Sequence, residues 1–70
     1  MIEVKANMAG SVWKIVVKEG EEVEDGQDLL ILESMKMEIP IATEDDGTVK
    51  ELKVQEGDFV NEGDVVAILE

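Results

Sequence analysis

The residues best suited to chemistry are the six at the centre of the chain, Glu33–Glu38, which read ESMKME. They place the amine of Lys36 between the thioethers of Met35 and Met37. A connection this short between paired strands usually has Gly, Asn or Asp at its central positions. Sequence rules of this kind tend to fail where function overrides them. We therefore predict a lysine that other proteins act on; the plainer alternative is a hairpin whose exposed lysine has no role.

The composition excludes several kinds of site. The chain contains no cysteine and no histidine. Disulfides, thiolate nucleophiles and cysteine zinc sites are therefore excluded, and the commonest general base and metal ligand is missing. The acidic loops lack the spacing of a calcium loop, and we expect their acids to be solvated. We predict no catalytic residue and no metal site, so this 70-residue chain is a poor candidate for an enzyme.

The charge of the chain limits its partners and its location. Eighteen acids and six lysines give a net charge of −12. Such a surface repels nucleic acid and anionic membranes, and partners are expected to present a basic face; the alternative is that the acids only maintain solubility. The longest apolar runs, such as Leu29–Leu32, are far shorter than the ~18 residues of a membrane span. No basic leader precedes an apolar segment, so we expect a cytoplasmic location.

An internal repeat supplies the elements that position Lys36. Residues Gly10–Glu33 align without a gap on Gly47–Glu70, at an offset of 37 residues, and ten of the 24 aligned positions are identical. Two copies predict one domain, residues 1–70, with pseudo-twofold symmetry. Lys36 lies midway between the copies, so the twofold would place it at the opposite pole from the two chain ends.

The apolar pattern predicts an all-β sandwich or barrel of short strands, because valine and isoleucine recur between turn signals. The predicted strands are Met1–Ala6, Ser11–Lys18, Leu29–Glu33, Glu38–Ala42 and Val65–Leu69. The alternation slips between Val12 and Ile15 and again between Val49 and Leu52, which predicts a bulge in each copy. Pro40 lacks an N–H, so its strand should be an edge or turn that nitrogen away from a partner. No segment has the 3.6-residue period of a helix.

Two acidic connections are predicted to be tight, each with one inward valine and two glycines of positive φ. These residues are Val23, Gly20 and Gly26 in the first connection, Glu19–Gln27, and Val60, Gly57 and Gly63 in the second, Glu56–Asp64. Trp13 and Phe59 are single aromatic residues. We predict that both pack within the domain and that neither forms a binding platform.

These motifs together resemble the biotinyl/lipoyl carrier domain family. Glu33–Glu38 matches the E-x-M-K-M-E signature of biotin acceptor domains. The flanking pattern G-x-V…EG-x-x-V-x-x-G occurs twice, as Gly10–Gly26 and Gly47–Gly63. The resemblance covers essentially the whole chain. It implies a flattened β-barrel of two four-stranded antiparallel sheets, with the modified lysine on an exposed hairpin.

The resemblance also implies a function. Lys36 would be biotinylated by a biotin protein ligase that reads Met35 and Met37 on either side. An ordinary lysine amine is protonated at neutral pH, so the ligase must supply a base. The attached biotin would carry a carboxyl group from a biotin carboxylase to a carboxyltransferase, at a roughly millimolar effective concentration. The domain, expected to be a monomer, would itself catalyse nothing.

Two departures from the family pattern leave alternatives open. Asn7–Gly10 lacks the proline that acceptor domains often have there, and no protrusion is inserted between the strands. Lipoyl domains resemble this chain in fold but usually carry Asp-Lys-Ala at the turn. Met35 and Met37 therefore favour biotin, whereas the compact scaffold leaves a lipoyl group, added by a lipoyl ligase, as a main or second modification. A further alternative is an unmodified module that binds partners through its acidic faces.

Overall fold

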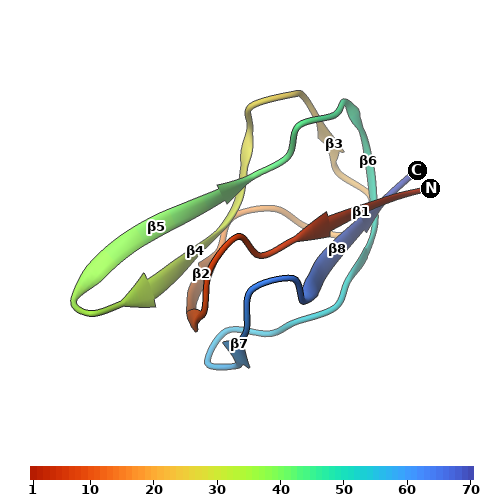
Figure 1. Cartoon of the computed structure of the whole chain (residues 1–70). Coiled ribbons are helices and arrows are strands. Elements are labelled where there is room, and N and C mark those ends of the chain that lie inside the picture. The colour runs from red at the N-terminus through yellow and green to blue at the C-terminus, as the bar shows by residue number, and fades with distance from the viewer.

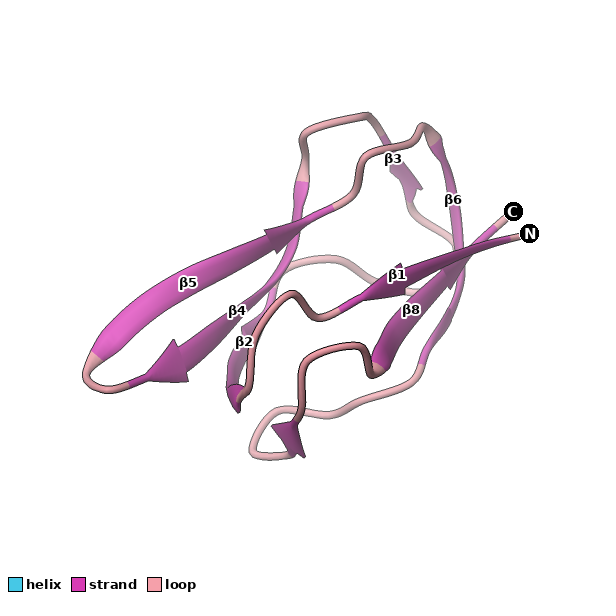
Figure 2. Cartoon of the chain, viewed as in Figure 1, coloured by secondary structure: helices cyan, strands magenta, loops and turns pink.

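The computed structural model describes residues 1–70, and every regular element in it is a β-strand (Figures 1 and 2). The strands are β1 (Ile2–Lys5), β2 (Gly10–Ile15), β3 (Glu22–Val23), β4 (Asp28–Ser34), β5 (Met37–Ala42), β6 (Gly47–Leu52), β7 (Phe59–Val60) and β8 (Val65–Leu69). They form two four-stranded antiparallel sheets, ordered β1-β8-β6-β3 and β5-β4-β2-β7. The predicted fold class is confirmed. There is no helix long and apolar enough to cross a membrane.

The repeat is visible in the topology. Adding 37 to the residue numbers carries β1, β2, β3 and β4 onto β5, β6, β7 and β8, and it carries one sheet order onto the other. Hydrogen bonds between the halves recur in the same way: Val12 N donates to Asp58 O, and Val49 N donates to Glu21 O. Each sheet therefore contains strands from both halves, and neither half could form a sheet of this kind alone.

One apolar cluster fills the space between the sheets. Its members are Val4, Ala6, Val12, Val17, Val23, Leu29, Leu30, Leu32, Ile41, Val49, Val60, Val66, Ala67 and Leu69. They include both inward valines predicted for the acidic connections, at 3% and 2% exposure. Thr43 is the one buried polar side chain, and its hydroxyl both donates to Asp45 O and accepts from Asp45 N. No buried side-chain polar atom is left without a partner.

Both predicted bulges are present. The register of β2 against β4 shifts between Val12 and Lys14, and that of β6 against β8 shifts between Val49 and Glu51. Pro40 lies in β5, an edge strand, as predicted. The loop glycines have positive φ as predicted; Gly20 is at 92° and its repeat mate is at 97°.

The loop acids do more than was expected of them. Glu56 Oε2 accepts from Ile15 N at 3.0 Å, and Glu19 Oε2 accepts from Leu52 N at 3.0 Å. Ile15 and Leu52 pair with β4 and β8 on one side. On the other side they lie four residues beyond the last residues that pair with the two-residue strands β7 and β3. Both acids are exposed, as expected, and in addition a carboxylate from each half accepts a hydrogen bond from the backbone of the other half.

Two predictions are corrected by the structure. β2 ends at Ile15 and not at Lys18, because the chain leaves the sheet after the bulge. Trp13 and Phe59 are not packing residues: they are 48% and 64% exposed. The chain neighbour of Phe59, Val60, points into the core, so alternation along the strand directs Phe59 to the outer face. Trp13 is the unpaired residue of the bulge in β2, where the regular alternation is interrupted.

Candidate functional site

The hairpin formed by β4 and β5 carries Lys36 at its tip. The two strands pair over six residue positions, ending with Ser34 opposite Met37, and only Met35 and Lys36 lie between them. Figure 1 shows this hairpin reaching away from the body at the left, while both termini lie together at the right. Lys36 is exposed. The predicted location of this lysine, at a pole opposite the chain ends, is confirmed.

The turn has an unfavourable backbone conformation. Met35 has a φ of 53° and Lys36 a φ of 64°, and they are the only residues other than glycine with positive φ. Positive φ at both central positions is the pattern of a type I′ turn, which suits the twist of a hairpin but favours Asn-Gly. A side chain in this left-handed region costs roughly 1–2 kcal/mol per residue. The sequence shows residues unsuited to a tight turn, but this conformation was not predicted from it; a two-residue loop would have indicated it.

The three side chains at the tip project into solvent. Met35 is 92% exposed and Met37 is 63% exposed. Lys36 Nζ forms no hydrogen bond and no ion pair; the one ion pair in the chain joins Lys53 to Glu51. The amine is therefore free to react, and two apolar side chains beside it are free to be contacted. An acyl group on Nζ would displace nothing, so the residues present fit a covalently attached cofactor.

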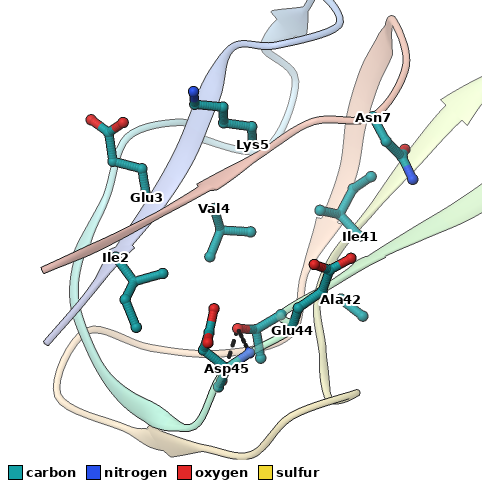
Figure 3. A pocket seen from close by; sticks show the side chains of 10 residues that line it. Ile2, Glu3, Val4, Lys5, Asn7, Ile41, Ala42, Glu44 and Asp45 are labelled. Atoms are coloured by element: carbon teal, nitrogen blue, oxygen red, sulfur yellow. Dashed lines mark hydrogen bonds between the residues drawn. The ribbon is translucent and has the colours of Figure 1, made fainter.

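The hollows of the surface lie elsewhere. A groove of about 360 Å³ separates the edge strands β1 and β5 at the end of β5 remote from the tip, and Figure 3 shows the repeat mates Val4 and Ile41 among its lining. A polar hollow of about 450 Å³ lies beside β3 and the start of β6. Neither includes Met35, Lys36 or Met37. The chemistry available at the tip is that of the exposed amine.

Comparison with known proteins places this geometry in context. The model of the family described as "Biotin-requiring enzyme" matches residues 2–69. The Biotin/lipoyl attachment protein of Bacillus subtilis is 60% identical over 63 residues, which are 90% of this chain and 86% of that protein. The Biotin carboxyl carrier protein of acetyl-CoA carboxylase from Solanum lycopersicum is 42% identical over 60 residues, which are 86% of each chain.

A solved structure gives the same result for the fold. The Kluyveromyces lactis urea carboxylase contains a segment that superposes with a TM-score of 0.93 at 32% identity. That segment covers 99% of this chain and 6% of the carboxylase chain. The similarity therefore extends over both repeats and is not confined to the six central residues.

Proposed function

The chain belongs to the family of biotin-requiring carrier domains, and from this premise we propose that Lys36 is the residue that accepts biotin. The domain is a biotin carrier of the kind found in biotin-dependent carboxylases and not itself a catalyst. The observation that carries the proposal for Lys36 is its exposed and unpaired amine, held at a strained turn between two exposed methionines.

The attachment step is an acyl transfer to Lys36 Nζ. A base on the biotin protein ligase takes up the proton that the amine loses as it becomes an amide nitrogen. Nζ attacks the activated carbonyl of biotinyl-adenylate, the amide C–N bond forms, the bond to the phosphate breaks and AMP leaves. Met35 and Met37 offer the ligase flexible apolar contacts on both sides of the amine. The positive charge of Lys36 is lost in the product.

Once attached, biotin carries a carboxyl group between a biotin carboxylase and a carboxyltransferase. The hairpin holds the attachment point away from the body, so that a tethered group can be presented at roughly millimolar effective concentration without a tight complex. The chain acts as a monomer in this proposal, because a net charge of −12 opposes self-association.

The mass of the intact protein tests the assignment of Lys36. After incubation with biotin, ATP and a biotin protein ligase, we expect the mass to increase by one biotinyl group. Lys36→Ala should remove this increase and should change the free energy of unfolding by no more than about 0.5 kcal/mol, since the side chain is exposed. The other five lysines, Lys5, Lys14, Lys18, Lys50 and Lys53, serve as internal controls. Biotin on any of them would contradict the assignment.

A lipoyl group is the second candidate for the same amine. It is favoured by the 60% identity to a protein whose name includes both cofactors, and by the compact scaffold, in which no protrusion is inserted between the strands. The same assay with lipoate and a lipoyl ligase distinguishes a biotin carrier from a carrier that accepts both.

A further inference from the structure

We propose that Trp13 and Phe59 form a docking surface for the biotin protein ligase on the outer face of the sheet that carries Lys36. This inference rests on the proposed function of Lys36. The two residues, called here the aromatic face, are 48% and 64% exposed. They lie on the neighbouring strands β2 and β7, in the same sheet as the hairpin of β4 and β5. Aromatic residues are enriched among those that contribute most to protein–protein binding.

The strand register places the aromatic face close to the hairpin. Glu38 pairs with Glu33, Glu33 with Ser11, and Ser11 with Phe59. Residues directly opposite one another share a face of a sheet, so these four exposed residues form one row across all four strands. Phe59 lies two strand spacings from Glu33, or about 10 Å. Trp13 lies two residues after Ser11 in the bulge of β2, farther from the tip and without a partner on β4.

The repeat supplies an internal control for what the fold requires. The mate of Trp13 is Lys50, and the mate of Phe59 is Glu22, at positions with the same backbone pairing in the other sheet. The same architecture therefore accepts a lysine and a glutamate where this half has tryptophan and phenylalanine. Folding does not explain two exposed aromatic residues on the sheet that bears Lys36 and none at the equivalent positions of its partner sheet.

The distance from the domain at which each enzyme acts indicates that the protein bound to the aromatic face is the ligase. A ligase must act on the bare amine at the end of a four-carbon stem, so it has to rest against the domain around the tip. A carboxylase acts on a ring at the end of a much longer arm and has no such need. A standard interface covers about 800 Å² of each partner, a patch roughly 30 Å across. A patch of that size centred near Lys36 includes the whole row from Glu38 to Phe59.

Charge defines the chemistry of the surface that would bind here. The row ends in two acids, Glu33 and Glu38, on the hairpin side and in an aromatic ring on the other. The complementary ligase surface has basic residues near its active site and an apolar pocket beside them. Opposite charges of this kind mainly increase the rate of association, whereas buried aromatic anchors mainly determine affinity.

The test replaces the aromatic face with the residues of its own repeat mates. We expect Trp13→Lys with Phe59→Glu to lower kcat/KM for biotinylation at least tenfold, which corresponds to about 1.4 kcal/mol. The loss should be in KM, with kcat within about twofold, because Lys36 and its flanking methionines are unchanged. The melting temperature should change little, because both side chains are exposed. If the double variant fails to fold, Phe59→Glu alone should show a threefold or greater loss.

Two controls make the result specific. Lys50→Trp with Glu22→Phe adds an aromatic pair to the other sheet while keeping Trp13 and Phe59, and it should leave the kinetics of biotinylation unchanged. In the ¹⁵N spectrum of the Lys36→Ala protein, the single indole N–H belongs to Trp13, and unlabelled ligase should shift or broaden it.

The outcomes separate this inference from the assignment of Lys36. Absence of biotin on the parent protein would contradict the proposed function. Biotinylation of the parent with unchanged KM in the double variant would overturn only the docking surface, as would an unaffected indole signal. Unchanged biotinylation together with slower carboxylation would assign the aromatic face to the carboxylase and likewise overturn the proposal for the ligase.

Discussion

Met35 and Lys36 hold backbone conformations that side chains other than glycine and asparagine seldom adopt. The strain is tolerated because the six residue pairs between β4 and β5 fix the turn. Strain of this kind in an ordered structure is a reason to suspect function. Asn or Gly would suit this turn conformation, but neither would place a long apolar side chain beside the amine. The choice of methionine is therefore best explained by recognition and not by stability.

Met35 and Met37 should decide the cofactor and not the fold. Replacing Met35 with Asp and Met37 with Ala recreates a lipoyl-like turn and adds a charge where the biotin ligase meets an apolar side chain. Specificity of this kind depends on repulsion as much as on attraction. We expect biotinylation to fall at least tenfold, or about 1.4 kcal/mol, with lipoylation kept or improved. The rates of both modifications on the variant and the parent measure the effect.

The melting temperature of the same double variant separates recognition from folding. Both side chains are exposed, and Asp enters the left-handed region more readily than Met. Stability should therefore be unchanged or slightly raised. A large loss of stability would show that the methionines belong to the core, and unchanged biotinylation would show that the ligase reads the scaffold alone.

At the scale of the elements, the bulges and the loop acids act together: the acids accept hydrogen bonds from backbone N–H groups of the bulged strands. Each bulge bends a central strand, and the neighbouring two-residue strand ends before it can pair with Ile15 or Leu52. Glu56 and Glu19 supply the missing acceptors from the opposite half. This explains why the acid-glycine pair occurs in both copies of the repeat. The acids therefore join the two halves of the chain, in addition to contributing negative charge.

Removing one of these acceptors should destabilise the domain. We expect Glu56→Ala to lower the free energy of unfolding by about 1 kcal/mol, since it leaves Ile15 N to solvent alone. That change lowers the melting temperature of a domain this size by about 4–8 °C. Glu56→Gln keeps an oxygen acceptor and should lose less. Thermal denaturation of the two variants measures the difference, and equal losses would show that charge and not the hydrogen bond is what matters.

The sequence predicted some elements well because the repeat shows them twice. The slips near Val12 and Val49 identified both bulges, and the paired glycines identified the turns. The two-residue strands β3 and β7 could not be predicted, because two residues have no period to detect. The exposure of Trp13 and Phe59 was not predicted because apolar character was taken as burial. Alternation with the buried Val60 would have indicated that Phe59 points outward, whereas Trp13 lies in the bulge.

The site itself was predictable in identity and place but not in conformation. The symmetry argument located Lys36 midway between the copies and hence at a pole, and the structure confirms that location. The left-handed turn depends on the length of the ladder between β4 and β5, since Ser34 and Met37 pair and leave only two residues to turn. The sequence boundaries predicted for these strands were one residue too short at Ser34 and Met37, which concealed the type of turn.

The whole molecule has two functional ends. It measures 31 × 18 × 18 Å, with the Lys36 hairpin at one end and both termini at the other (Figure 1). The termini are held there by pairing, with Ile2 of the edge strand β1 opposite Leu69 of its neighbour β8. Any chain attached to the domain therefore begins far from the tip, and the carrier can be tethered to other proteins without covering the amine.

This polarity predicts that fusion at either end is tolerated. A globular domain joined to Met1 or to Glu70 through a flexible Gly/Ser linker should leave kcat/KM for biotinylation within about twofold, because such a linker imposes no fixed orientation. The melting temperature of the carrier should also be preserved, since neither terminal residue is buried. The rates of modification of the two fusions and the free domain provide the comparison. A tenfold loss in either fusion, with folding intact, would mean that the ligase contacts the end of the domain that carries the termini, and that its footprint extends well beyond the hairpin and the aromatic face.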